Sequence, residues 1–142
     1  MDVKDIRFKA KRLDNGEWVK GDLIHSTSYI GICIYHSSNT FLDVPVVYKV
    51  DPNTVCMFTG LKDKNGKYIH EGDIVKREGY IDYDEYVKVG KIEGVIKMCD
   101  YSWCIVYKKD DMVCKHPLFM EEEFCNINEL EVIGNIYEGV KK

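Results

Sequence analysis

The chain has 142 residues, of which 45% are hydrophobic and 31% are charged, and its formal net charge is −4. This composition excludes wholesale disorder and suits one ordinary domain or two small ones, while the acidic balance disfavours nonspecific attraction to phosphate backbones. No apolar run approaches the roughly 18 residues that span a bilayer, and residues 1–5 have no leader-like pattern, so we expect a cytoplasmic protein without a membrane partner.

The first half of the chain predicts a series of short strands. Residues 6–11 alternate apolar with cationic side chains, a period of two that gives a strand one apolar face. A turn through Asn15-Gly16 returns the chain into residues 18–24 and makes a hairpin. Further β-branched runs cover residues 29–35, 44–50 and 55–61. Because Pro45 has no amide hydrogen, its strand begins there or lies at a sheet edge.

Two polar turns near the middle of the chain indicate where one module ends and the next begins. Residues 62–67 contain an Asn-Gly pair, which suits the corner of a hairpin. Residues 70–73 make a second polar bend before apolar sequence resumes. We therefore expect two β modules, residues 1–69 and residues 70–142.

The second module predicts more short strands, at residues 87–89, 92–98, 101–107 and 130–137. Trp103, Ile105 and Tyr107 share one face of their strand because they alternate. The acidic, tyrosine-rich residues 79–86 predict an exposed loop. Residues 108–125 are the only plausible site for a helix, and Pro117 limits that helix to one or two turns. The fold class is all-β, with at most one or two short helices.

Three blocks of sequence resemble a known family. Residues 58–67 (FTGLKDKNGK) and 69–75 (IHEGDIV) are similar to the central signature of the YopX family. Residues 130–138 (LEVIGNIYE) resemble its carboxy-terminal signature, and residues 8–18 fit its amino-terminal hairpin. The blocks lie at both ends and in the middle of the chain, so the resemblance covers nearly its whole length.

The resemblance implies a protein encoded by prophages and mobile elements of low-GC Gram-positive bacteria, with a carboxy-terminal module similar to an SH3-like barrel. It implies no reaction, no catalytic residue and no cofactor. Its signature residues are the candidates for a structural or binding role: Thr59, Gly60, Leu61, Asp63, Asn65, Gly66, Glu71, Gly72, Asp73, Gly134 and Asn135. The sequence departs from the family pattern at residues 55–57 and in the loop 79–86.

Motifs for metals and cofactors are weak in this sequence. No two of the six cysteines form a Cys-x-x-Cys pair. The cysteines are Cys33, Cys56, Cys99, Cys104, Cys114 and Cys125. Cys114, His116 and Cys125 make only a loose group, and a reducing compartment favours free thiols. Residues 63–66 resemble part of a calcium loop, but Leu61 and Gly72 would occupy its first and last ligand positions. We predict no metal and no cofactor.

The best cluster for acid–base chemistry is His70 with Glu71 and Asp73. A polar bend whose carboxylates accept backbone hydrogen bonds explains the same residues, and we prefer it because a functional pair needs burial that sequence does not reveal. The sequence has neither a Gly-x-Ser-x-Gly elbow nor a nucleotide-binding glycine loop. We predict that the protein is not an enzyme, and a small enzyme using this cluster ranks third among the functions considered.

The preferred function is a non-catalytic interaction or assembly component of a prophage that self-associates or binds a phage or host protein. Residues 1–12 are basic and residues 110–131 are acidic, which suits head-to-tail pairing between subunits. The alternative is a nucleic-acid-associated phage protein, because Arg7, Lys9 and Lys11 form a cationic strand face. We favour it less because basic residues do not interleave with the aromatic ones in the sequence.

Overall fold

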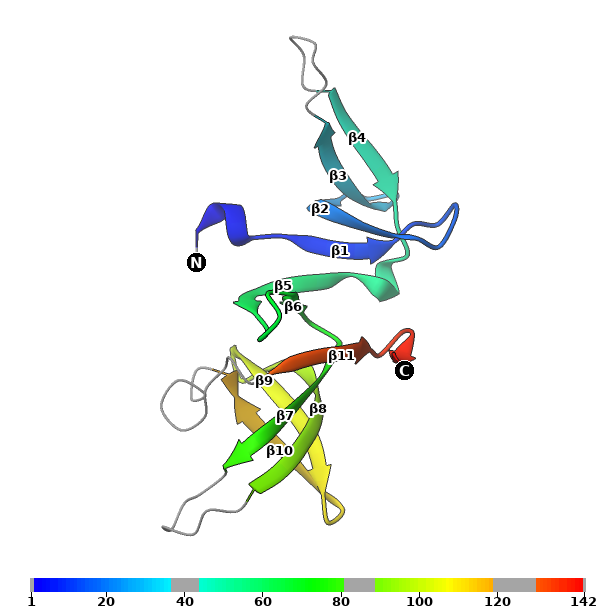
Figure 1. Ribbon diagram of the computed structural model, residues 1–142. Helices are drawn as coiled ribbons and strands as arrows, with labels where there is room; N and C mark the ends of the chain where they lie inside the picture. The colour runs from blue at the N-terminus through cyan, green and yellow to red at the C-terminus, as the bar shows by residue number, and fades with distance from the viewer. Residues whose placement is uncertain (1, 37–43, 81–88, 119–129, 142) are drawn as a thin grey trace. The chain divides into compact units, whose positions relative to one another are not determined.

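The computed structural model describes residues 2–36, 44–80, 89–118 and 130–141 and shows an all-β protein, as predicted (Figure 1). Its strands in chain order are β1 (Phe8–Lys11), β2 (Trp18–His25), β3 (Ile30–His36), β4 (Val44–Lys49), β5 (Cys56–Lys62), β6 (Tyr68–His70), β7 (Asp73–Tyr80), β8 (Val89–Cys99), β9 (Ser102–Lys109), β10 (Met112–Pro117), β11 (Glu131–Asn135) and β12 (Gly139–Val140). Two single 3-10 turns accompany them, η1 (Val3–Asp5) and η2 (Pro52–Thr54). Within these ranges, no helix has the length and apolar character needed to cross a membrane.

The strands form two six-stranded sheets with the orders β4-β3-β2-β1-β5-β6 and β10-β9-β8-β7-β11-β12. The chain itself divides into two compact units, Met1–Gly60 and Leu61–Lys142. The division lies inside β5, earlier than the residue 70 expected from sequence, because Leu61 and Ile69 pack in the hydrophobic core of the second unit. The polar bend at 70–73 is thus internal to that unit.

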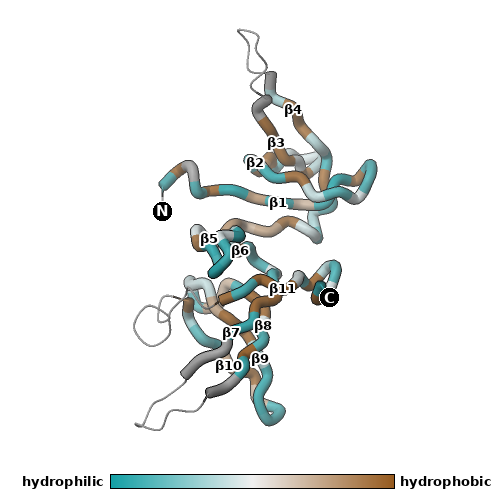
Figure 2. The backbone as a smooth tube through the Cα atoms, in the orientation of Figure 1, coloured by the Kyte–Doolittle hydropathy of each residue, from teal (hydrophilic) through white to brown (hydrophobic). Residues whose placement is uncertain are grey.

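In the first unit, β1 to β4 pair antiparallel in sequence order, and β5 pairs with β1. β1 pairs with β2 from Phe8↔Gly21 to Lys11↔Trp18, and its apolar and cationic residues alternate as predicted (Figure 2). The buried residues of its core are Ala10, Val19, Ile32 and Val50. The strand β4 lies at the edge of its sheet, which agrees with the position of Pro45.

The second unit has the larger core. It contains Ile69, Val75, Ile92, Ile96, Ile105, Leu118, Leu130 and Val132. Trp103 and Tyr107 pack against this cluster beside Ile105, so the face predicted for β9 is confirmed. The long strand β8 curves (Figure 1) and is paired to β7 on one side and to β9 on the other.

Closure of this second sheet into a barrel is not seen among the described strands, because β10 and β12 end the strand order without pairing to each other. The SH3-like barrel therefore stays a prediction. The helix predicted at residues 108–125 is wrong for its first part: β9 runs to Lys109 and β10 begins at Met112. Asp110 and Asp111 adopt left-handed backbone conformations, with φ of 52° and 62°, and this turns the chain into a hairpin instead.

Two other sequence predictions fall partly outside the described residues. The predicted tyrosine-rich loop begins within β7, which extends to Tyr80, and residues 81–88 lie outside the described part of the chain. Residues 119–129, the remainder of the predicted helix with Cys125, also lie outside it.

Candidate functional site

The signature residue Asp63 lies at the hairpin turn between β5 and β6, where its side chain is buried, with 6% exposed. Its Oδ1 accepts hydrogen bonds from the backbone N–H groups of Asn65 and Lys67, both at 2.9 Å. Its Oδ2 accepts the N–H of Val132, 69 residues later, also at 2.9 Å. One carboxylate thus shapes its own turn and holds the start of β11 against it.

Further contacts join the same turn to β11. The Lys64 N–H donates to the Leu130 carbonyl at 2.8 Å, and the Lys64 and Lys76 ammonium groups lie 3.1 and 3.3 Å from Oε2 of Glu131. These hydrogen bonds lower the pKa of Glu131, that from Lys64 first and that from Lys76 second. Asn65 and Gly66 complete the turn, with Gly66 at a φ of 78° that favours glycine.

The His70–Asp73 bend connects β6 to β7. Oδ2 of Asp73 accepts the backbone N–H of His70 at 2.8 Å and lies 3.9 Å from the ring Nδ1 of the same residue. Both side chains are almost fully buried. Gly72 has a φ of 82°, donates its N–H to Ile96 and accepts the N–H of Ile136, so the bend joins β8 to the segment that follows β11.

Glu71 does not join this pair. It is half-buried, and burial raises the pKa of its carboxyl group. It forms no hydrogen bond or ion pair with any residue in the described part of the chain. The structure therefore brings His70 and Asp73 together but leaves Glu71 apart from them.

The carboxy-terminal signature residues shape the end of β11. Gly134 faces the backbone of β12 so closely that an added Cβ would lie 2.1 Å from the carbonyl oxygen of Gly139. Oδ1 of Asn135 accepts the N–H groups of Tyr137 and Glu138, at 2.9 and 3.0 Å. The same residue pairs with Asp73 across β7 and β11, so the central and carboxy-terminal signatures meet in space.

The remaining signature residues lie along β5. Thr59 is buried within the first unit, and Gly60 is exposed with a φ of 88°. Leu61 packs against the core of the second unit. Backbone geometry at Gly60 and the packing of Leu61 are the roles that the structure shows for this group.

Metal-ligating groups are not gathered anywhere in the described residues. The five cysteines within them are free thiols, and Cys33, Cys56 and Cys104 are buried. Burial raises the pKa of Cys104, which keeps its thiol protonated. Cys114 and His116 both lie on β10, while Cys125 is outside the described chain.

Sequence reasoning missed one buried ionic side chain, Arg77 on β7. Only 2% of it is exposed, and it is among the largest fully buried side chains. It alternates with Val75 and pairs across the sheet with Ile92, both buried. The period of two is the signal that could have placed Arg77, two residues after Val75, on the inward face of its strand.

Sequence reasoning also missed the cation–aromatic contacts of the first unit. The ammonium groups of Lys9 and Lys11 lie 4.8 and 5.4 Å from the ring centre of Trp18. The guanidinium of Arg12 lies 4.1 Å from the ring centre of Tyr48. Basic and aromatic residues do not interleave in the sequence, but strand pairing places Lys11 opposite Trp18.

Comparison with known proteins identifies a family whose model includes these signature blocks. The family model described as YopX protein matches residues 7–141, nearly the whole chain, and confirms the resemblance seen in the signatures. Among curated proteins, none matches this chain.

The first prediction concerns Asp63. We expect Asp63→Asn to lower the free energy of unfolding of the second unit by about 1.5–3 kcal/mol, because an amide offers one acceptor oxygen in place of two and turns an N–H donor toward a backbone donor. Urea unfolding followed by the fluorescence of Trp103, in a Trp18→Phe background, measures it. Asp51→Asn, at a turn where Oδ1 accepts a single N–H, is the control and should be nearly neutral. If Asp63→Asn lowers the free energy of unfolding by no more than Asp51→Asn does, the role assigned to Asp63 is contradicted.

The second prediction concerns the dependence of stability on pH. Because the folded chain lowers the pKa of Glu131, its contribution is present above the ordinary value of 4.5 and is lost as the pH falls through the lowered one. Glu131→Gln should therefore have a lower free energy of unfolding than the wild type at neutral pH, and this difference should disappear in acid. Urea unfolding of both proteins across this pH range measures the difference, with Glu93→Gln as the exposed control. A difference that does not change with pH would refute the assignment.

Proposed function

We propose that this chain, which belongs to the YopX protein family, is a non-catalytic interaction or assembly module. One observation carries the proposal: three polar side chains of the family signature accept hydrogen bonds from backbone N–H groups. Asp63 accepts three N–H groups, and Asp73 and Asn135 accept one and two. Groups used in this way hold the second unit together, so a partner would be bound by other residues, exposed on its surface.

The His70–Asp73 pair supports the same proposal. Catalysis by an acid–base pair requires both groups to face a site that admits substrate. Here both side chains are almost fully buried, and Oδ2 of Asp73 is already an acceptor for the backbone of its own bend. An enzyme that uses His70, Glu71 and Asp73 is therefore the least favoured function.

We infer that the module works in the cytoplasm of a bacterial host that carries the prophage, and that its second unit closes in the manner of an SH3-like barrel. The curvature of β8 and the consecutive antiparallel pairing of β7 to β10 support that closure. Self-association is the first interaction to test. The basic residues 1–12 and the acidic residues 110–131 offer complementary charge, although residues 119–129 lie outside the described chain.

A second candidate function, association with single-stranded nucleic acid, is favoured by the cation–aromatic contacts of the first unit. Single strands bind where basic side chains track phosphates and aromatic rings stack on bases. Lys9 and Lys11 share one side of β1 with Trp18 of β2, and Lys20 lies opposite Lys9. The first unit therefore places three cations and an indole ring on neighbouring strands.

The third prediction tests assembly. We expect light scattering of the full chain at low ionic strength to give a mass well above that of one chain, and the mass to fall toward the monomer in high salt because exposed charges are screened. Lys9→Glu with Lys11→Glu should lower the mass at low salt, whereas the control Lys67→Glu with Lys141→Glu should not. A monomer at low ionic strength would dismiss self-association.

The fourth prediction tests the second candidate. If the first unit binds single strands, a fluorescent oligothymidylate should bind at low salt, and Trp18→Ala should weaken that binding by about 1 kcal/mol or more. Affinity should fall steeply as salt rises. Reversal of Lys97 and Lys108, in the second unit, is the control that should change little. An oligothymidylate that does not bind at low salt rules this function out.

A further inference from the structure

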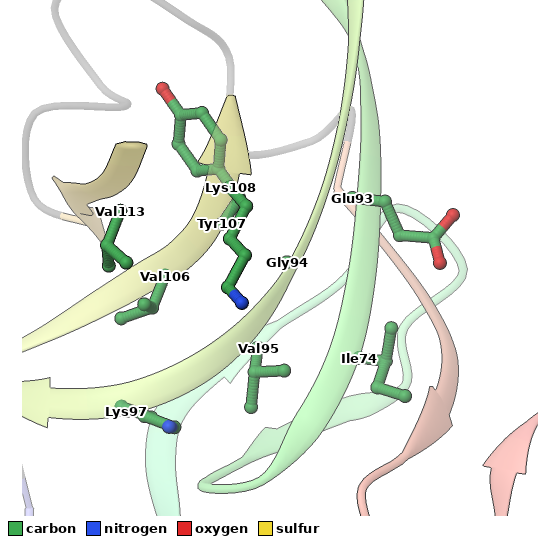
Figure 3. A pocket seen from close by; sticks show the side chains of 9 residues that line it. All are labelled: Ile74, Glu93, Gly94, Val95, Lys97, Val106, Tyr107, Lys108 and Val113. Carbon is green, nitrogen blue, oxygen red and sulfur yellow. The ribbon is translucent and has the colours of Figure 1, made fainter. Parts of the chain in front are cut away.

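An open hollow of about 450 Å³ lies on the surface of the second unit (Figure 3). Its apolar lining comes from β7, β8, β9 and β10 and consists of Ile74, Val95, Val106, Val113 and Tyr107. Val113 is 59% exposed, and Val95 and Val106 are half-buried. Apolar residues in such contact with water are typical of interaction sites rather than of a core.

The hollow arises where β8 and β9 diverge. Their ladder runs only from Val95↔Val106 to Cys99↔Ser102. Before Val95, β8 continues beside β7, whereas after Val106, β9 continues beside β10. Gly94 sits at the point of divergence, where an added Cβ would lie 2.6 Å from Cγ2 of Ile105 and 2.7 Å from the carbonyl oxygen of Val106. The absence of a side chain at Gly94 lets the strands approach and part there.

The charges around the hollow are mainly positive. Lys97 and Lys108 line it and are exposed, and neither forms an ion pair within the described chain. Lys115 is also exposed and pairs with Val106 across β9 and β10, so it projects from the same face. Glu93 is the one carboxylate of the lining, and in Figure 3 it points away from both lysine side chains.

We infer that this hollow binds an extended, acidic peptide segment of a protein partner. An apolar side chain of the peptide rests against Val95, Val106 and Val113, and its flanking carboxylates pair with Lys97 and Lys108. An extended chain presents every second side chain to the same side, so the apolar residue and the acidic residues that contact the hollow lie two positions apart in the peptide. This inference rests on the proposed interaction function and adds the chemistry of the partner.

A nucleic acid suits this hollow less well than a peptide. Stacking of bases requires aromatic platforms, and the lining offers one tyrosine ring among aliphatic side chains. Exposed aliphatic residues with polar groups around them instead match the anatomy of protein interfaces, in which an apolar centre is enclosed by a polar rim.

The experiment uses the full chain and a fluorescent synthetic peptide in which glutamate and leucine alternate at every second position, with serine between them, titrated by fluorescence anisotropy. We expect saturable binding that weakens about tenfold or more in Lys97→Glu with Lys108→Glu, because two attractions become repulsions. Val113→Ser should also weaken binding, because it removes part of the apolar wall without adding charge. Lys67→Glu with Lys141→Glu is the matched control for net charge, and the same peptide with lysine in place of each glutamate is the control for peptide charge.

Three outcomes would overturn the inference. They are no saturable binding of the acidic peptide, an equal loss of affinity in the Lys97/Lys108 variant and in the Lys67/Lys141 control, and equal affinity for the acidic and the basic peptide. Tighter binding of oligothymidylate than of the acidic peptide at Lys97 and Lys108 would assign the hollow to nucleic acid instead. Thermal melting confirms that each variant is folded. Light scattering separates this test from that of the proposed function, since self-association can persist when the peptide fails to bind.

Discussion

The second unit depends on one buried carboxylate. A charge removed from water is costly unless hydrogen bonds replace its hydration, and Asp63 receives three, all from backbone N–H groups. Two of them fix the turn that carries it, and the third fixes Val132 at the start of β11. Leu130 and Val132, on either side of Glu131, then lie in the hydrophobic core. The position of β11 between β7 and β12 follows from that anchor.

The two signature blocks of the family are therefore one structural feature. Residues 58–75 and residues 130–138 are far apart in the sequence, but the turn at Asp63, the bend at Gly72 and the β7 residue Asp73 all contact the second block. Residues that hold the fold in this way need not recognise anything. The surfaces left for recognition are those of the exposed strands, such as the cationic face of β1 and the hollow beside β9.

Local patterns were enough to predict most strands, because the period of two at residues 6–11 and the Asn-Gly corners act within a few residues. Contacts across strands were not predictable in this way. The pairing of Lys11 with Trp18, the burial of Arg77 and the position of Ile69 in the second core all depend on which strands become neighbours. The helix expected at residues 108–125 is not formed in residues 108–117, since Asp110 and Asp111 adopt left-handed conformations, which aspartate tolerates better than most residues, and turn the chain into a hairpin. For the candidate site, the signature residues could be identified from the sequence, but the backbone groups that they bind could not.

The bond between Asp63 and Val132 spans 69 positions, and this has a consequence for synthesis on the ribosome. Closing so long a loop costs entropy that no local contact repays, and its second half emerges last. While the nascent chain still ends before residue 130, the carboxylate of Asp63 has only its own turn to bind and remains open to water on its other oxygen. The second unit thus completes its core after translation has passed Val132, whereas β1 to β4 already have all their partners by residue 60.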